Sequence, residues 1–189
     1  MRSQWLVLAG CGLVALAGCA GRRTGTAAAE HTAAVRGPGF RADVLHALRN
    51  DVNAAYGFRN GAPRINLGPC GRFARDFRER WNARFRDRVD IAFVMAGDGS
   101  QCHHVLLKLP DGSFYDGGNG IMTAAALAAL YPGSRIDVMT RFDPALLDAR
   151  SYGLSRSYPE CPNYSDATTD RLIDQRLALL PADAPADDR

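Results

Sequence analysis

Lysine is almost absent from this chain. Lys108 is the only one, so nearly all basic residues are arginines, and the formal net charge is only +3. Seven arginines crowd residues 72–88, but acidic residues are interspersed among them: Asp76, Glu79 and Asp87. Mixed charge of this kind is typical of a solvated helix face. The balance argues against a protein that binds nucleic acid.

Also missing is a hydrophobic run long enough to be interpreted as a membrane span. The apolar stretch at residues 5–17 is too short for that and follows the positively charged Arg2, which is the pattern of a secretion signal. At its end, Leu16-Ala17-Gly18-Cys19 resembles the lipobox of bacterial lipoproteins. The alternative is an ordinary cleaved signal that contains a chance cysteine.

The lipobox resemblance implies where the protein is located. In that family, residues 1–18 would be removed as a signal peptide, and Cys19 would carry the lipid, palmitate included, that anchors the mature protein to a membrane. Ala20, rather than an aspartate, follows Cys19. By analogy with the family this favours the outer membrane of a bacterial envelope, with the protein facing the periplasm.

Large apolar side chains are scarce at both ends of the expected mature chain. Residues 19–39 and 181–189 cannot bury enough surface to fold, so we expect a flexible tether and a disordered tail. Residues 40–180 between them, roughly 140 residues, have the size of one domain with a real core. No internal repeat is visible.

The expected folded domain contains an odd number of cysteines. Cys11 and Cys19 belong to the signal and the anchor, which leaves Cys70, Cys102 and Cys161. Unpaired thiols are uncommon in an oxidising compartment, and an odd count leaves one cysteine out of any intramolecular pairing. We expect a Cys102–Cys161 disulfide and a free Cys70. Pairing of Cys70 with either of the others, which would mask its thiol, is the alternative.

A helix is predicted to begin at or near Cys70. Apolar residues recur behind it every four positions: Phe73, Phe77, Trp81 and Phe85. This periodicity indicates a helix face packed on the core. Free amides and the helix dipole at its start favour a thiolate and can hold an oxyanion. Asn66 is a further candidate donor to that oxyanion, and a buried structural role for Cys70 is the alternative.

A hairpin loop at Pro110-Asp111-Gly112 predicts which histidine faces which carboxylate. The proline and glycine favour a three-residue loop. It would make the pairs Leu109–Ser113, Leu107–Tyr115 and Leu106–Asp116. Asp116 then shares a face with His104 and lies diagonal to it, while His103 points away. A slip of one residue would exchange the two histidines, and a mere surface pair is the alternative.

These segments are similar to a known family. Gly68-Pro69-Cys70-Gly71-Arg72-Phe73-Ala74 resembles the nucleophile segment of the transglutaminase-like branch of papain-like cysteine enzymes, and His104 and Asp116 resemble its second and third motifs. The resemblance implies an α+β fold in which the nucleophile helix packs on a small antiparallel sheet. It also implies a Cys70–His104–Asp116 triad. Val105-Leu106 after the histidine, and the lack of a clear oxyanion glutamine, depart from the family.

We therefore expect a cysteine-dependent peptidase or amidase, a thiol hydrolase of the cell envelope. A non-catalytic binding or scaffold lipoprotein on the same fold is one alternative, and a transglutaminase-type acyltransferase is another. No cofactor is expected, and no metal site, because alternating side chains at Cys102, His103 and His104 would not converge on one ion. Expected helices are 41–56, 71–85 and 122–130, and expected strands are 89–96, 103–109, 113–116 and 136–140.

Overall fold

The computed structural model describes residues 39–151 and 157–182. The expected signal peptide, Cys19, the tether up to residue 38 and residues 183–189 of the expected tail lie outside the described residues. Within the described part of the chain, no helix is both long and apolar enough to cross a membrane.

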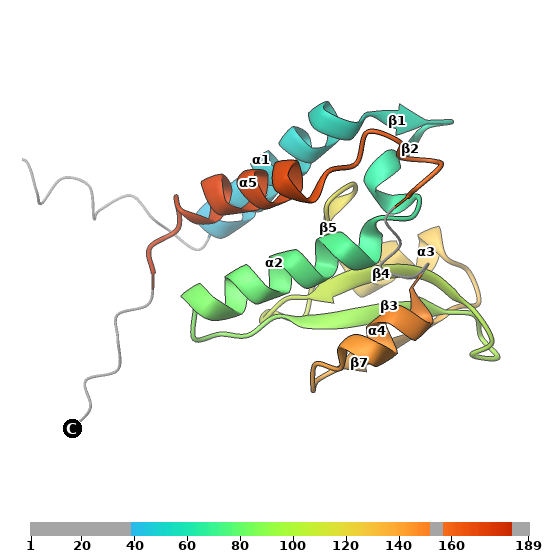
Figure 1. The fold of residues 1–189 in the computed structure, drawn as a ribbon. Helices are drawn as coiled ribbons and strands as arrows, with labels where there is room; N and C mark the ends of the chain where they lie inside the picture. Colours follow the sequence, from blue (N-terminus) through green and yellow to red (C-terminus); the bar gives the residue numbers. More distant parts are fainter. Residues whose placement is uncertain (1–38, 152–156, 183–189) are drawn as a thin grey trace, which may run out of the picture. The chain divides into compact units, whose positions relative to one another are not determined.

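The described domain combines helices with antiparallel sheets (Figure 1), which confirms the α+β class. The helices are α1 (Gly39–Tyr56), α2 (Cys70–Arg84), α3 (Ala124–Leu130), α4 (Pro144–Arg150) and α5 (Asp166–Leu177), with a 3-10 turn at Arg64–Asn66. The strands are β1 (Phe58–Arg59), β2 (Ala62–Pro63), β3 (Asp90–Met95), β4 (Cys102–Lys108), β5 (Phe114–Asp116), β6 (Gly120–Met122) and β7 (Arg135–Met139). The first two strands form a small hairpin, and the other five form a sheet in the order β6-β5-β4-β3-β7.

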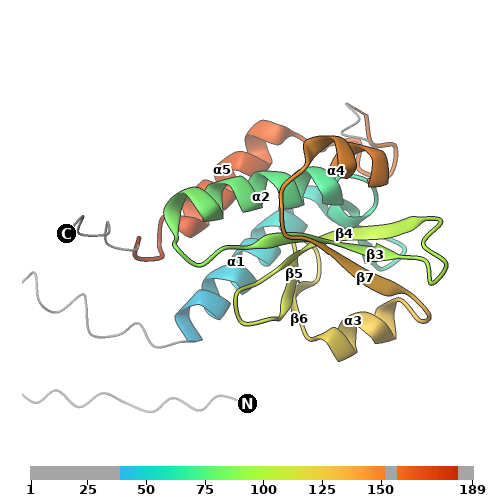
Figure 2. The same ribbon diagram turned by 90° about the horizontal axis from the view of Figure 1, so that it is seen from below.

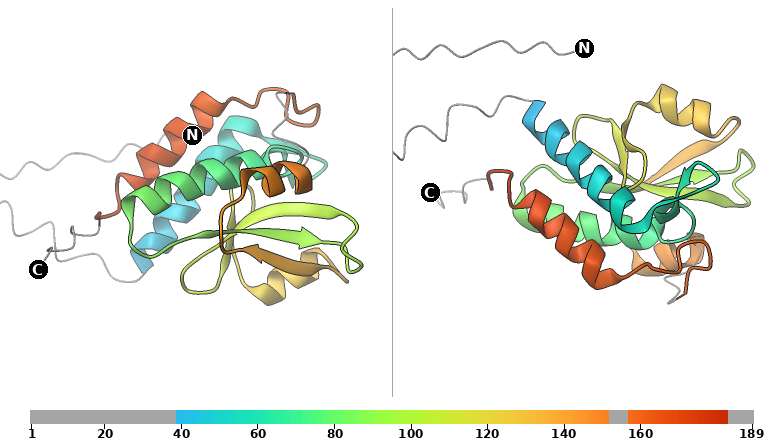
Figure 3. Two further views of the ribbon diagram at one scale, coloured as in Figure 1. Left: turned by 60° about the horizontal axis from the view of Figure 1, so that its bottom comes forward. Right: turned by 90° about the horizontal axis from the view of Figure 1, so that it is seen from above.

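The sheet is covered on both faces. Helix α2 lies on one face and α3 on the other (Figures 2 and 3). Helix α1 contacts the edge strand β6 and lies beside α5, which in turn contacts α2. The aromatic side chains predicted to face the core do so: Phe73, Phe77 and Trp81 of α2 are fully buried. Phe77 contacts Tyr115 of β5, with ring centroids 5.2 Å apart. This packing holds the start of α2 against β4.

All of the predicted helices and strands are present, with their ends shifted by one or two residues. The helix predicted at 122–130 begins at Ala124, because Met122 belongs to the edge strand β6. Thr123 caps it by accepting a hydrogen bond from the amide of Ala126 at 3.1 Å. Helices α4 and α5 were not predicted. Each has a capping side chain before it, Asp143 and Ser165 respectively.

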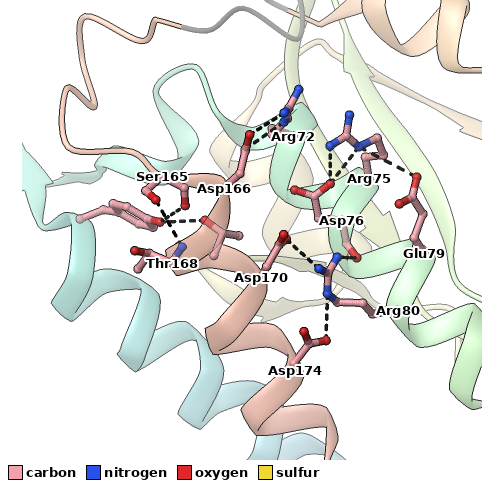
Figure 4. A network of polar contacts seen from close by, with 12 residues as sticks. Arg72, Arg75, Asp76, Glu79, Arg80, Ser165, Asp166, Thr168, Asp170 and Asp174 are labelled. Atoms are coloured by element: carbon pink, nitrogen blue, oxygen red, sulfur yellow. Dashed lines mark hydrogen bonds and ion pairs between the residues drawn. The ribbon is translucent and has the colours of Figure 1, made fainter.

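The arginine-rich face of α2 is paired with α5 (Figure 4). Arg72 makes a two-pronged contact with Asp166, and Arg80 contacts both Asp170 and Asp174, at 3.0 and 2.9 Å. The mixed charges therefore join two helices, and the expectation of a purely solvated face is wrong for these two arginines. The reason is that α5, which the sequence pattern did not reveal, brings a row of aspartates to this face.

The β4–β5 hairpin has the predicted register. The amide of Leu109 donates to the carbonyl of Ser113 at 2.8 Å, and Leu107 pairs with Tyr115. Gly112 has φ of 85°, the left-handed conformation that such a loop needs. The ladder ends at Leu107–Tyr115, however, so the expected Leu106–Asp116 pair is not part of it. Beyond that point β5 leaves β4.

Candidate active site

Cys70 is the first residue of α2, as predicted, and close packing fixes its position. Gly68 has φ of 129°, and a Cβ there would lie 3.0 Å from the ring of Tyr158. A Cβ on Gly71 would lie 2.8 Å from the Cβ of Ser151, at the end of α4. The glycines on both sides of Cys70 therefore let two other segments approach the helix start. The thiol is partly buried and free.

The thiol of Cys70 faces β4 where that strand has lost its partner β5. The sulfur interacts with the ring of His104 and with the backbone amides of Val105 and Gly71, and the thiol makes a long contact of 3.9 Å with the carbonyl of Gly68. Burial alone would raise the pKa of the thiol, but the hydrogen bond to His104, its positive charge and the two amides together lower it. The surroundings therefore favour a thiolate.

His104 lies between Cys70 and Asp116. Its side chain is 1% exposed, and Nε2 donates to Oδ2 of Asp116 at 2.9 Å. The other ring nitrogen, Nδ1, is buried and has no hydrogen-bond partner, so it is available to the Cys70 thiol, with which the ring interacts. Such contacts are often long in unliganded enzymes and tighten when substrate binds. Burial lowers the pKa of His104, but the hydrogen bonds to Asp116 and Cys70 and their negative charges raise it overall.

Asp116 is held by five hydrogen bonds. Besides His104, it accepts from the Asn66 side chain at 3.1 Å, from the amides of Gly118 and Asn119 at 2.8 and 2.6 Å, and from the Asn119 side chain at 3.0 Å. Burial alone would raise the pKa of this carboxyl, but His104 and the other donors lower it. A carboxylate so completely bonded keeps its charge and fixes the orientation of the imidazole.

Asn66 contacts the carboxylate of Asp116. Its side-chain amide donates to Oδ1 of Asp116, while the residue also borders a cavity beside Cys70. The sequence could not show this, because the 3-10 turn that carries Asn66 meets the Asp116 loop only in the folded domain. Backbone amides at the start of α2 remain as oxyanion donors.

Two residues of the site were missed in the sequence. Asn119 contacts Asp116 through its backbone and its side chain, and the Gly118-Asn119 turn after Asp116 was a usable signal for such a contact. Tyr131, just after α3, stacks on the ring of His104 with centroids 5.8 Å apart and an angle of 13° between the rings. It covers the imidazole on the face of the sheet opposite α2, and no local motif marks it.

The two adjacent histidines differ in burial but border the same space. His103 is exposed, whereas His104 is buried. Val94 of β3 pairs with His104 and Met95 pairs with Cys102, which makes His103 the extra residue of a β-bulge. Both histidines border one cavity beside Cys70, and the bulge interrupts the regular alternation on which the expected direction of His103 was based. The described residues contain no group of three or more side chains arranged to bind a metal.

The expected Cys102–Cys161 disulfide is not formed. Cys70, Cys102 and Cys161 are all free. The thiol of Cys102 donates to the carbonyl of His104 at 3.3 Å, whereas that of Cys161 contacts Asn163. The fold places the two thiols in different surroundings, a separation that cysteine spacing does not encode.

The arrangement brings the thiol of Cys70, the imidazole of His104 and the carboxylate of Asp116 together, with a cavity beside the sulfur. These are the parts of a nucleophilic acyl-transfer site. Comparisons with protein-family models, with curated proteins and with solved structures find no match for this chain.

Proposed function

We propose that this domain is a cysteine-dependent hydrolase of peptide or amide bonds, with a papain-like core of the transglutaminase-like kind. The observation that carries the proposal is the buried position of His104, whose Nε2 is bonded to Asp116, whose Nδ1 has no other partner, and whose ring interacts with the Cys70 thiol. A structural ion pair alone would not need a free thiol at a helix start on its other side.

In the proposed reaction, the Cys70 thiolate attacks the carbonyl carbon of the substrate and forms a C–S bond. The carbonyl oxygen becomes an oxyanion, which the free amides at the start of α2 stabilise. The tetrahedral intermediate collapses, the C–N bond breaks, and the imidazolium of His104 gives its proton to the leaving amine. Water activated by the now neutral His104 then hydrolyses the thioester and regenerates the thiolate. Asp116 holds the imidazole orientation throughout.

We further propose that the domain acts in a bacterial cell envelope as a lipoprotein anchored through Cys19. The lipobox-like Leu16-Ala17-Gly18-Cys19 supports this proposal. A substrate in the cell envelope, and an outer-membrane location facing the periplasm, would follow from that anchor.

The decisive test is alkylation of the purified, non-reduced protein with iodoacetamide across pH, mapped by mass spectrometry. Cys70 should react with a midpoint well below that of an ordinary cysteine. Cys102 is an internal control, because burial and the charge of Cys70 raise its pKa to about 11. The Cys70→Ala variant should fold normally and lose all turnover. Residual turnover in that variant, or a Cys70 that titrates like a free cysteine, would refute the proposal.

An acyltransferase on the same site is a second candidate. Cys70 borders two separate cavities, so an acceptor other than water has room beside the acyl-enzyme. Product analysis with an added amine separates the two activities: a hydrolase releases mainly the free acid, and an acyltransferase mainly the new amide.

A further inference from the structure

Two cavities meet at Cys70. The first, of about 270 Å³, is lined by His104, Ser100, Gln101 and Arg150, and the second, of about 420 Å³, by Leu67, Tyr158 and Pro159. Cys70 and His103 border both cavities. His104 lines the first of these two cavities and not the second.

The position of His104 indicates which part of a bound substrate occupies which cavity. In an acyl transfer to Cys70, the leaving amine must receive its proton from the imidazolium, so it must lie in the cavity that His104 borders. We propose that the leaving amine occupies the first cavity and the acyl group the second, with His103 standing between them. The proposal rests on the proposed function and adds the substrate's orientation and class to it.

The lining of the second cavity favours an apolar acyl group. Leu67 is half-buried, Tyr158 is buried with its ring against Gly68, and Pro159 adds a further apolar surface. Glu160 also lies there, but its carboxylate is paired with Arg59. A charged acyl side chain would therefore lose its hydration without gaining an opposite charge.

The first cavity has the opposite chemistry. Ser100, Gln101 and His103 are polar, and Arg150 brings a guanidinium that is partly exposed and bonded to Asp137 at 3.2 Å. Asp137 also pairs with Arg135 at 3.4 Å, so the single carboxylate leaves the two arginines with a net positive charge. This lining favours a leaving amine that carries a carboxylate. The inferred substrate class is an amide between an apolar acyl group and an amino acid or short peptide with a nearby carboxylate.

Peptide aldehydes test the acyl side without turnover. The Cys70 sulfur adds to the aldehyde carbon, and the proton goes to the oxygen, giving a thiohemiacetal that protects Cys70 from iodoacetamide. N-acetylphenylalaninal should protect Cys70 at a concentration about tenfold or more lower than N-acetylaspartinal, because its apolar side chain is buried in the second cavity. Leu67→Glu should abolish the preference and the milder Leu67→Thr should reduce it, while Arg150→Gln should leave it unchanged.

The outcomes separate this inference from the function on which it rests. Suppose that Cys70 titrates as an activated thiol. If both aldehydes then protect it equally, or if Arg150→Gln changes the preference between the aldehydes and the Leu67 variants do not, the proposed substrate orientation is wrong and the proposed function stands. If Cys70 titrates like an ordinary cysteine and neither aldehyde protects it, the proposed function fails first.

Competition between two amine acceptors tests the first cavity, which is proposed to hold the leaving amine. Cys70 is acylated with the p-nitrophenyl ester of N-acetylphenylalanine, p-nitrophenol leaves, and the thioester is captured by alanine or by alaninamide at equal free-amine concentrations. Alanine should be captured several-fold faster, and Arg150→Gln should remove the difference. Equal capture by the unmodified protein would overturn the carboxylate assignment.

Discussion

Asp116 shows how a buried carboxylate can remain charged. Burial penalises its ionised form, yet five donors surround its two oxygens and its pKa is lowered. Its charge supports the imidazolium of His104, and the imidazolium in turn supports the thiolate of Cys70. The three groups therefore titrate as one coupled system, not as separate side chains.

The coupled charges predict a bell-shaped pH dependence of kcat/KM. As pH rises through the lowered pKa of Cys70, the thiolate forms and activity appears. As pH rises further through the raised pKa of His104, the proton needed by the leaving amine is lost and activity falls. The acidic limb should lie below the pKa of an ordinary cysteine and coincide with the alkylation midpoint. An activity that only begins near the ordinary thiol pKa would contradict this.

Asn66→Ala distinguishes two roles for that side chain. If Asn66 holds Asp116, as its 3.1 Å hydrogen bond indicates, the variant should move the alkylation midpoint of Cys70 upward, because the carboxylate loses a donor. If Asn66 instead bound the oxyanion, kcat would fall and the midpoint would stay. Asp116→Asn should give a larger shift of the same sign and lower kcat/KM by about a hundredfold or more. Asp43→Asn, at an exposed position of α1, is the matched control and should change neither quantity.

Helix α2 carries the thiol at its first residue, and its body and its first turn are held in place by different contacts. Aromatic side chains attach its body to the sheet, and glycines let its first turn approach α4 and the Tyr158 segment. Strand β4 contributes the other half of the site. It has a bulge at His103, and its pairing with β5 stops at Leu107, so Val105 is not paired with β5. An interrupted strand beside a helix start is what gives the sulfur two amides and an imidazole.

Gly71→Ala should displace the start of α2. Alanine is a better helix former by about 1 kcal/mol, but the new Cβ would lie 2.8 Å from the Cβ of Ser151. We expect lower stability in urea denaturation and a slower alkylation of Cys70. Adding Ser151→Gly removes the opposing atom and should restore both. A single variant as stable and reactive as the parent would show that the helix start is not tightly packed.

Phe77→Ala and Arg80→Ala compare the two sides of α2. Phe77 is fully buried against Trp81 and Tyr115, so its truncation should cost about 3–5 kcal/mol of unfolding free energy. Arg80 pairs with Asp170 and Asp174 at a partly exposed site, so its loss should cost about 1 kcal/mol or less. Chemical denaturation measures both. A larger effect of Arg80→Ala would mean that the ion pairs with α5, and not the aromatic core, hold the helix.

Two clusters of buried side chains hold the domain together, and no disulfide links the described cysteines. Buried residues from α1, α2, α5, β3, β4 and β5 form a single cluster that includes Cys161, and a smaller cluster under α3 covers the other face of the sheet. The three described cysteines take part as free thiols.

Reduction should therefore leave the stability of the domain unchanged. The unfolding midpoint of the purified domain should be the same with and without dithiothreitol, since no described cysteine is paired. A Cys102–Cys161 disulfide would instead make the reduced protein less stable by about 2–4 kcal/mol. Non-reducing peptide mapping is the independent check. The Cys102→Ser variant should likewise keep the midpoint within a few degrees.

Local chemistry in the sequence was enough to predict the three central residues. The four-residue spacing of aromatics predicted the start and the buried face of α2, and the Pro110-Asp111-Gly112 loop predicted the β4–β5 register and hence the contact between His104 and Asp116. Periodicity and turn conformation depend on neighbouring residues alone, so one sequence is sufficient to read them.

Long-range contacts decided the rest. The meeting of Asn66 with Asp116, the stacking of Tyr131 on His104, the ion pairs between α2 and α5, and the separation of Cys102 from Cys161 join segments far apart in the chain. The bulge at His103 depends on the partner strand β3. No local pattern encodes such pairings, because each forms only when packing of the core brings the segments together, and for that reason only the tertiary structure reveals the two cavities at Cys70.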